Sequence, residues 1–566
     1  MRFPAFSLLP VLVSIASALT GYDVNDIIRE RCCPGDDCYP SQEQLAALNT
    51  QMEGRLLLPA MDEYRNQSHM YNTLEQRFPN LIAMVKSAKD IQAVVKFAHA
   101  HNLHVTVRSS GHDYMGRSTW EGSFLINLSE MNEMEIDLNS SRSQYGTVKV
   151  QTGLQWQEIY QKLNAVSRVV VGGSAHTVTP GGYTLGGGHS PVSRSLGYAV
   201  DNLLEVQIVF ADGSIATCTE SRTVIKTYDG NFQYVENGDL FWALRGGGHS
   251  FGVVVYFLFR LHPMPKGMVT FASTIAIDIP AFGINYFNAT MLLLRDLIVT
   301  MPTQWGGYWM INNGPGTFPV GESVIQYRGL LSLYFNKFGA WDGTEKAVFK
   351  SFTDWATAAN VPFTFANKSD FWDFEKDAAD PPITRAYLAN SLLQPELLTE
   401  EFVSFMHSGL FLTSEYLACT GATLGGKTTN EPSGGTPLHP GYRSTITSLS
   451  CGIVLNDADK DLLDQPNKDQ ERIEGFWPFA EGLRKYGRGM YVNEAWKDNP
   501  YWREDFWGSN YDRLLSVKLR FDPKNFFTCH HCVGSEHLPG PKDGTSVAAR
   551  MAAPWLLVVL VMGLIR

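Results

Sequence analysis

The sequence predicts a two-lobed α+β protein, and three observations lead to that fold class. The chain has 566 residues, more than one simple hydrophobic core accommodates. Strand-like and helix-like apolar runs alternate from Asn80 onward and resume after the proline-rich stretch His262–Pro265. Hydrophobic residues make up 44% of the chain and charged residues 18%, an ordinary globular balance that excludes a disordered or fibrous protein.

The charge balance excludes one class of partner. Lys and Arg number 46 against 57 Asp and Glu, which gives a net charge of −11. A nucleic-acid-binding protein needs a basic surface. We therefore expect no nucleic-acid partner.

Both ends of the chain have features of targeting segments. Residues 1–18 place one Arg before an apolar run and end in Ala16-Ser17-Ala18, which is typical of a secretory signal peptide. The tail, residues 538–566, ends in an apolar stretch of about 13 residues, shorter than the roughly 20 that span a bilayer. Small residues over Gly544–Ser546 fit a GPI-attachment signal, with an unprocessed hydrophobic tail as the alternative. The sequence predicts a secreted protein whose only membrane contact is such a lipid anchor.

Secretion into an oxidising compartment makes the eight cysteines candidates for disulfides, with the pairing left open. Structural zinc sites usually draw ligands from two separated pairs, so we interpret Cys529-His-His-Cys532 as something other than zinc and expect no metal. Five Asn-x-Ser/Thr sequons predict surface glycans: Asn66, Asn127, Asn139, Asn288 and Asn367.

After a cysteine-bearing lead segment, residues 19–75, the first lobe is expected over residues 76–265. A helix is predicted over residues 90–101 from its apolar spacing. Strands are predicted over residues 81–85, 105–108, 124–127, 146–151, 204–210 and 253–261.

The second lobe is expected over residues 266–485, and an aromatic-rich segment follows over residues 486–537. Strands are predicted in this lobe over residues 269–279, 326–335 and 444–454, and helices over residues 283–299 and 345–359.

Three glycine-rich segments carry the functional argument. Residues 107–114 read VRSSGHDY, residues 179–189 read TPGGYTLGGGH, and residues 245–252 read RGGGHSFG. Glycine is needed where the backbone approaches a ligand closely, and successive backbone N–H groups form concavities that bind anions. The three segments together predict a cradle for a diphosphate.

A fourth segment, residues 421–428, matches the P-loop pattern. A P-loop opens directly into a helix, whereas Pro432 and Pro437 soon follow here. We expect the end of a strand and a loop instead. None of the four segments contains Gly-x-Gly-x-x-Gly, so a Rossmann dinucleotide site has no support.

Taken together, these motifs resemble those of the berberine bridge enzyme-like group, FAD-linked oxidases of the vanillyl-alcohol oxidase / p-cresol methylhydroxylase (PCMH) superfamily. Residues 107–114 resemble the flavinylation loop of that group, and residues 181–202 and 241–254 resemble its second and third glycine loops. Residues 491–494 and 507–527 resemble its closing segment.

The resemblance implies a bipartite PCMH-type FAD-binding domain, made of residues 76–265 and a returning segment 486–537, with an inserted α+β substrate-binding domain between them. It implies a covalent bond from His112 to the 8α carbon of the flavin. Ala175 stands where many members carry a second linking Cys, so we expect a single link. The implied FAD-binding residues are Arg108, Ser109, Ser110, Gly111, His112, Asp113, Val178, Thr179, Gly182, Gly186, Gly188, His189, Gly252, Val254, Tyr491 and Asn493.

Alcohol oxidation requires hydride transfer to flavin N5 and a base for the hydroxyl proton. The resemblance places Tyr491 and Glu494 beside the ring as candidate bases, the tyrosine on condition that nearby positive charge lowers its pKa. His439 and Tyr442 are second-rank candidates. The oxygen-gating position of the family is the small Val178, which favours an oxidase.

The predicted function is therefore a secreted, monomeric FAD-dependent oxidase that acts on an alcohol or carbohydrate and passes electrons to molecular oxygen, giving hydrogen peroxide. Three alternatives stay open: an FAD-dependent dehydrogenase, an oxidative tailoring enzyme of secondary metabolism, and a cell-surface protein without turnover.

Overall fold

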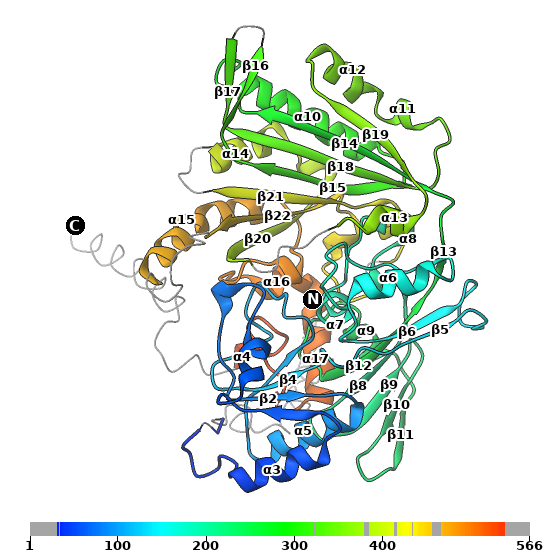
Figure 1. Cartoon of the computed structure of the whole chain (residues 1–566), viewed down its shortest axis with the longest axis vertical. Coiled ribbons are helices and arrows are strands. Elements are labelled where there is room, and N and C mark those ends of the chain that lie inside the picture. The colour runs from blue at the N-terminus through cyan, green and yellow to red at the C-terminus, as the bar shows by residue number, and fades with distance from the viewer. Residues whose placement is uncertain are drawn as a thin grey trace, which may run out of the picture.

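The computed structural model describes residues 31–537, apart from residues 33, 321–322, 379–383, 412–415, 433 and 456–465. The predicted signal peptide and the predicted GPI-signal tail lie outside the described residues. Figure 1 shows two lobes stacked along the long axis of the molecule. Within this part of the chain, none of the helices combines the length and apolar character that crossing a bilayer requires.

A four-stranded sheet with the order β1-β2-β4-β3 lies at the end of the first lobe. Its strands are Arg55–Leu57, Leu81–Met84, Phe124–Asn127 and Val105–Arg108, of which the last three are parallel. Helix α5 (Ala88–Ala100) begins where the Ser87 side chain accepts a hydrogen bond from the Asp90 backbone, and α3 spans Gln42–Gln51. Both helices bury apolar side chains against this sheet, as the 3.6-residue period predicts.

A seven-stranded antiparallel sheet completes the first lobe, in the order β11-β10-β9-β8-β12-β6-β5. Its strands are Phe232–Val235, Thr223–Lys226, Ile215–Cys218, Leu203–Val209, Val253–Arg260, Thr147–Gln151 and Met134–Asp137. Central strand β12 follows the third glycine segment directly. The sheet therefore holds the end of that segment in place.

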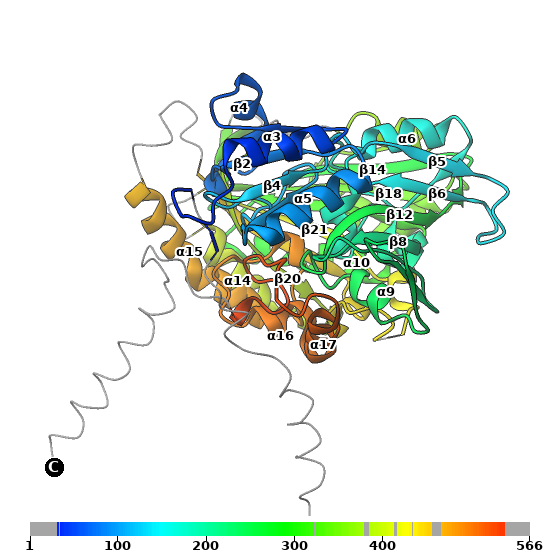
Figure 2. The same ribbon diagram turned by 90° about the horizontal axis from the view of Figure 1, so that it is seen from below.

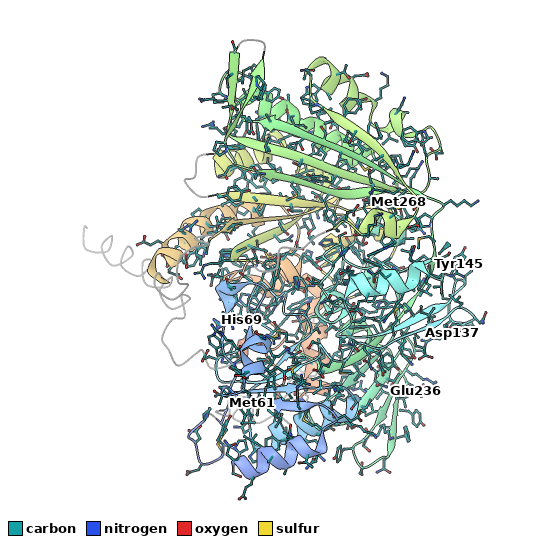
Figure 3. All side chains as sticks on the ribbon, in the orientation of Figure 1. Met61, His69, Asp137, Tyr145, Glu236 and Met268 are labelled. Carbon is teal, nitrogen blue, oxygen red and sulfur yellow. A yellow bond between two sulfur atoms is a disulfide. The ribbon has the colours of Figure 1, made fainter. Side chains whose placement is uncertain are left out.

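The second lobe is built on another seven-stranded antiparallel sheet, in the order β19-β14-β18-β15-β21-β22-β20. Its strands are Phe363–Lys368, Met268–Ile277, Gly329–Phe338, Trp305–Asn312, Leu417–Thr423, Thr447–Val454 and Ala386–Leu393. Helices α10 (Ile284–Thr300) and α14 (Glu400–Phe411) cover its outer face (Figure 1). Its inner face is turned toward the first lobe. Met268, the first residue of β14, lies where the chain enters this sheet (Figure 3).

The structure divides two predicted elements of the second lobe. The helix expected over residues 345–359 is two helices, α11 (Glu345–Val348) and α12 (Lys350–Ala358), because the buried Phe349 leaves the helical path between them. The strand expected over residues 326–335 is also divided. Strand β17 ends at Tyr327 and β18 begins at Gly329, and the intervening Arg328 donates its N–H to the Asp278 carbonyl.

The C-terminal segment returns to the first lobe. Helix α17 (Tyr511–Phe521) packs against α9 (Asp239–Leu244), and the Trp507 indole N–H donates to the Gly246 carbonyl at 3.0 Å. The buried Lys518 ammonium donates to the Phe527 carbonyl at 2.6 Å. Figure 2 shows α16 (Trp502–Trp507) and α17 on the side of the molecule opposite α3 and α4 (Asp62–Ser68). The first lobe is thus built from two separate parts of the chain, with the second lobe inserted between them.

Three disulfides answer the open question of cysteine pairing for the described residues, from which Cys33 is missing. Cys32 pairs with Cys38, Cys419 with Cys451, and Cys529 with Cys532, while Cys218 is a buried free thiol. The Cys529–Cys532 bond agrees with the interpretation of that segment as something other than a zinc site.

One predicted glycan site is wrong. Asn127 is 1% exposed and donates its side-chain amide to Gln67 Oε1 at 3.1 Å, so a glycosyltransferase has no access to it in the folded protein. Asn66, Asn139 and Asn367 are exposed, and Asn288 is half-buried.

The P-loop lookalike is a strand end and a loop, as predicted. Strand β21 ends at Thr423, and Gly426–Thr429 form only a short 3-10 helix.

Candidate active site

A cavity of about 1130 Å³ lies between the glycine loops of the first lobe and the inner face of the inserted sheet. Sites for drug-sized ligands typically measure about 300–1,000 Å³, so this cavity has room for more than a small substrate. Fourteen of the sequence-predicted site residues line it: Ser109, Ser110, Gly111, His112, Asp113, Val178, Thr179, Gly182, His189, Gly252, Val254, Tyr491, Asn493 and Glu494.

The first glycine loop leaves strand β3 at Arg108 and carries His112 into the cavity. His112 Nε2 lies 2.7 Å from Thr177 Oγ1, and its ring stacks on Tyr71 with the ring centroids 4.0 Å apart. These two contacts fix the orientation of the imidazole. Ala175 also lines the cavity, and its methyl group cannot form a thioether.

The next residue, Asp113, anchors this loop. Burial opposes ionisation of Asp113, but the Arg117 guanidinium, 2.6 Å from Oδ1, lowers the pKa of the carboxyl. Arg117 also donates to the Val492 carbonyl at 3.0 Å. The ion pair thus joins the loop to the C-terminal segment.

Arg108 lies outside the lining of the main cavity. Its side chain lines a neighbouring cleft of about 310 Å³ that shares Ser109, Ser110 and Thr179 with the main cavity, and its Nη1 donates to the His69 carbonyl at 2.9 Å. Burial lowers the pKa of Arg108 to about 10. The structure thus places Arg108 beside the main cavity, at the end of a strand whose other residues line that cavity.

Gly186 and Gly188 support the site without lining the cavity. They follow helix α7 (Pro180–Leu185), and a Cβ on Gly186 would lie 2.3 Å from Asn493 Nδ2. Gly188 has φ of +69°, a conformation that favours glycine. The room left at Gly186 lets Asn493 Nδ2 donate to the Gly182 carbonyl at 3.2 Å.

Tyr491 does not meet the condition set for a tyrosine base. It is 3% exposed, and its hydroxyl accepts a hydrogen bond from Asn493 Nδ2 at 3.1 Å. Burial and the nearby Glu494 carboxylate raise the pKa of Tyr491 well above its ordinary value, although Arg117 acts weakly in the opposite direction. The direction of this pKa shift does not favour Tyr491 as the base.

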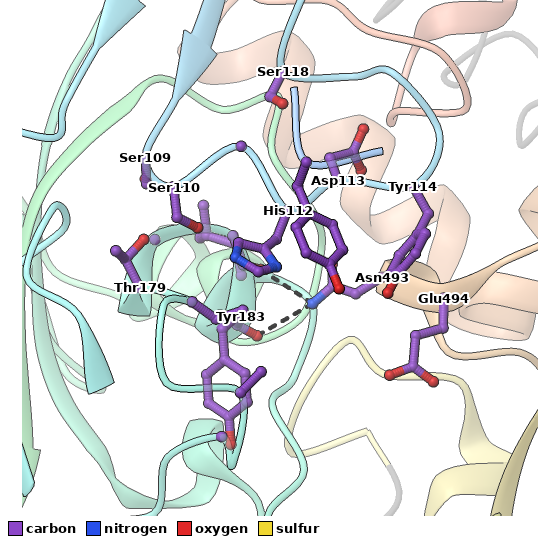
Figure 4. Close-up of a pocket in the computed structure, with 18 of the residues that line it drawn as sticks. Ser109, Ser110, His112, Asp113, Tyr114, Ser118, Thr179, Tyr183, Asn493 and Glu494 are labelled. Carbon is purple, nitrogen blue, oxygen red and sulfur yellow. Dashed lines mark hydrogen bonds between the residues drawn. The ribbon is translucent and has the colours of Figure 1, made fainter. Parts of the chain in front are cut away.

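Glu494 has the properties of an ionised base. Burial raises its pKa, but His189, whose Nε2 lies 3.5 Å from Oε1, and the Ser450 hydroxyl, which donates to Oε2, together lower it. The net direction is downward, so the carboxylate is charged at neutral pH. Figure 4 shows the Glu494 carboxylate on the side of Asn493 away from His112, and both residues line the cavity.

The second-rank candidates His439 and Tyr442 do not line the cavity. His439 Nδ1 accepts a hydrogen bond from the Gly441 backbone at 2.9 Å and caps a short 3-10 helix, Pro440–Arg443. Tyr442 is buried against Tyr198 and Tyr491. Both residues support the site from behind, which corrects the prediction that they act in it.

Sequence reasoning missed a buried acid next to the cavity. Glu375, the last residue of α13 (Phe371–Glu375), is 1% exposed and accepts a hydrogen bond from Ser174 Oγ at 3.0 Å. No cation of the described chain pairs with it, and burial raises the pKa of this carboxyl to about 8. No motif marks this glutamate in the sequence. Sequence reasoning also missed three residues that line the cavity, His249, Tyr308 and Ser450.

Comparisons with known families identify the fold and its cofactor. The family model described as an FAD binding domain matches residues 79–219, and the model described as berberine and berberine like matches residues 490–534. The chain thus carries an FAD-binding domain and a berberine-like C-terminal segment, and it is an FAD-linked oxidoreductase like its relatives. The first match falls on the N-terminal part of the bipartite domain and the second on its C-terminal part.

Individual relatives of this FAD-linked oxidoreductase span nearly its whole length. The FAD-linked oxidoreductase ZEB1 of Gibberella zeae is 27% identical, over 96% of this chain and 99% of its own. The VAO-type flavoprotein MtVAO713 of Myceliophthora thermophila C1 shares the fold with a TM-score of 0.76, at 22% identity over 89% of this chain and 97% of its own. Glucooligosaccharide oxidase from Acremonium strictum, described with a 6-S-cysteinyl, 8α-N1-histidyl FAD, has a TM-score of 0.68, at 19% identity over 87% and 99% of the two chains.

The cavity of this oxidoreductase fits FAD. Residues 109–112 border it and supply successive backbone groups suited to a diphosphate. Several buried polar atoms of residues that line it, among them Thr179 Oγ1, His249 Nδ1 and Thr528 Oγ1, have no protein hydrogen-bond partner among the described residues. Buried polar groups are normally hydrogen-bonded, so these atoms are suited to a ligand.

Proposed function

We propose that the protein is an oxidase that converts an alcohol to a carbonyl compound, with FAD linked through His112 and molecular oxygen as the final acceptor. The observation that carries this proposal is the position of the ionised Glu494 in the same cavity as His112. FAD, when bound, supplies the two-electron acceptor for the hydride. The remaining requirement, a base for the hydroxyl proton, is met by this chain.

Glu494 takes the proton of the substrate hydroxyl on its carboxylate. His189 and Ser450 hold that carboxylate from two sides and stabilise its charge before the reaction. Tyr491, held by Asn493, is buried beside His189 with the ring centroids 4.9 Å apart, and it packs against the histidine that contacts the base. These residues orient the hydroxyl and accept its proton, so that the hydride leaves from the neighbouring carbon.

The covalent link and the choice of oxygen rest on further residues. Thr177 and Tyr71 hold the His112 ring in one orientation, and Ala175 supports a single link. Val178 borders the cavity with a small side chain, which favours access of oxygen. An enzyme that used another electron acceptor would reduce its flavin with substrate but yield no peroxide. Secretion and a monomeric state remain predictions.

Replacement of the base tests the function. Purified wild-type protein is expected to absorb near 450 nm, to bleach with an alcohol substrate and to release hydrogen peroxide. Glu494→Gln is expected to retain its flavin absorbance while the rate of flavin reduction falls by about 10²–10⁴-fold, the usual contribution of a general base. Undiminished flavin reduction in this variant overturns the assignment of Glu494.

A further inference from the structure

The inner face of the inserted sheet forms the wall of the cavity that faces the FAD domain, and its composition follows from strand register. Met310 on β15 lies opposite Thr420 on β21, which lies opposite Ser450 on β22. In the next row, Ala418 lies opposite Gly452, which lies opposite Leu388. Side chains two residues apart on a strand share a face, so these rows lie side by side on the cavity.

Six of the residues on this wall have no side-chain group that forms ordinary hydrogen bonds. We call them the apolar wall: Met310, Leu388, Ala418, Ala422, Gly452 and Val454. In the described part of the chain, no charged or amide side chain from this sheet lines the cavity, and every charged group there comes from another element. The wall thus offers a substrate mainly dispersion contacts and removal from water.

The serine hydroxyls of the same face accept hydrogen bonds from one buried amide, and Ser448 keeps its own O–H as a donor. Asn390 Nδ2 donates to Ser448 Oγ at 2.9 Å and to Ser450 Oγ at 2.8 Å. Ser450 in turn donates to Glu494. The remaining hydroxyls that this sheet presents to the cavity are those of Thr420, Tyr308 and Tyr334.

This distribution discriminates between classes of alcohol. A sugar ring carries hydroxyl groups around its whole edge, and each one that leaves water without gaining a partner weakens binding. An alcohol with one hydroxyl on an apolar body needs one polar contact and otherwise gains from burial. The wall therefore favours the second class.

We propose that the substrate is a small uncharged alcohol with a single hydroxyl on an aromatic or aliphatic body. The hydroxyl lies at Glu494 and the body lies on the apolar wall. This inference rests on the proposed alcohol oxidation and adds the class of substrate to it.

Anaerobic flavin reduction with a substrate panel tests the inference on the holoenzyme. Benzyl alcohol, cinnamyl alcohol and 1-hexanol are compared with cellobiose and xylobiose by the bleaching near 450 nm. At least one apolar alcohol is expected to exceed both disaccharides in kcat/KM by about tenfold or more, the scale of discrimination by an apolar site. A higher kcat/KM for a disaccharide overturns the inference and leaves alcohol oxidation standing. Failure of every alcohol to reduce a bound flavin overturns the proposed function as well.

Polar substitutions on the apolar wall test the location. Ala418→Gln and Leu388→Gln are each expected to raise KM for the preferred alcohol by about tenfold, with unchanged flavin absorbance. Leu388→Met keeps the apolar surface and is expected to stay within about threefold of wild type. Ala366→Gln, on the exposed part of β19 in the same sheet, serves as the matched control. Unchanged KM in Leu388→Gln, or an equal rise in Leu388→Met, excludes this wall as the binding surface.

Discussion

His189 Nε2 lies 3.5 Å from Glu494 Oε1, and this contact joins the second glycine loop to the C-terminal segment across more than 300 residues of chain. Glu494 would be hard to ionise if burial acted alone. His189 and the Ser450 hydroxyl reverse that effect and lower the pKa of the carboxyl. The inserted domain and both parts of the FAD domain therefore each contribute to one proton acceptor.

Replacing His189 is expected to move the acidic limb of the pH–rate profile. In His189→Gln the favourable imidazole contact is lost, so burial raises the pKa of Glu494. Because the carboxylate is the active form, kcat/KM then begins to fall at a higher pH than in the wild type. The measurement is kcat/KM for flavin reduction between pH 4 and 8. The control is His69→Gln, because His69 is an exposed histidine. If the acidic limbs of His189→Gln and wild type coincide, the proposed role of His189 is contradicted.

The covalent link is tested by denaturation. Wild-type protein is expected to keep a yellow, fluorescent band on a denaturing gel, whereas His112→Ala is expected to release all flavin. Thr177→Val removes the hydroxyl 2.7 Å from His112 Nε2 and is expected to slow flavin attachment while leaving the linking atom in place. A fluorescent band in His112→Ala places the link on another residue.

The fold was predictable from sequence wherever a local pattern determined it. The apolar spacing of residues 90–101 predicted α5 to within two residues at its start, and the three glycine segments predicted the cradle. Position-specific motifs also located His112 and Glu494 at the cavity. These features depend on residues close together in the chain.

The remainder of the site depends on register and burial, which no local pattern reveals. Ser450 reaches Glu494 only because β22 pairs with β21 and β20 in one register. The pKa of Tyr491 is raised by its burial beside Glu494, so the condition set for a tyrosine base is not met. Arg108 ends the strand before the expected loop, and its side chain lines the neighbouring cleft, which the loop motif alone does not reveal.

Gly186 is expected to tolerate no side chain. In Gly186→Ala the new methyl group would lie 2.3 Å from Asn493 Nδ2 and displace that amide from the Gly182 carbonyl. We expect a loss of about 1–3 kcal/mol in the free energy of unfolding together with reduced flavin content. Gly475→Ala is the control, because the added methyl group meets open space in a helix and is expected to be neutral or stabilising. Equal stability and flavin content in Gly186→Ala and the wild type contradict the requirement for a close approach.

Glu375 is expected to make stability fall as pH rises. Its pKa in the folded protein is about 8, raised by burial from an ordinary value of 4.5, so the folded state keeps a proton that the unfolded chain releases. The contribution of Glu375 to the free energy of unfolding is therefore greatest below pH 4.5, and this contribution is lost progressively as the pH rises to about 8. Glu375→Gln removes this dependence while it keeps an acceptor for Ser174. Relative to wild type, the variant is expected to gain about 2–4 kcal/mol between pH 5 and pH 8, measured by urea unfolding at each pH. The control Glu236→Gln, at an exposed position, is expected to show no such gain. If the free energy of unfolding of Glu375→Gln and of wild type changes with pH in parallel, Glu375 is ionised in the folded protein and the prediction is contradicted.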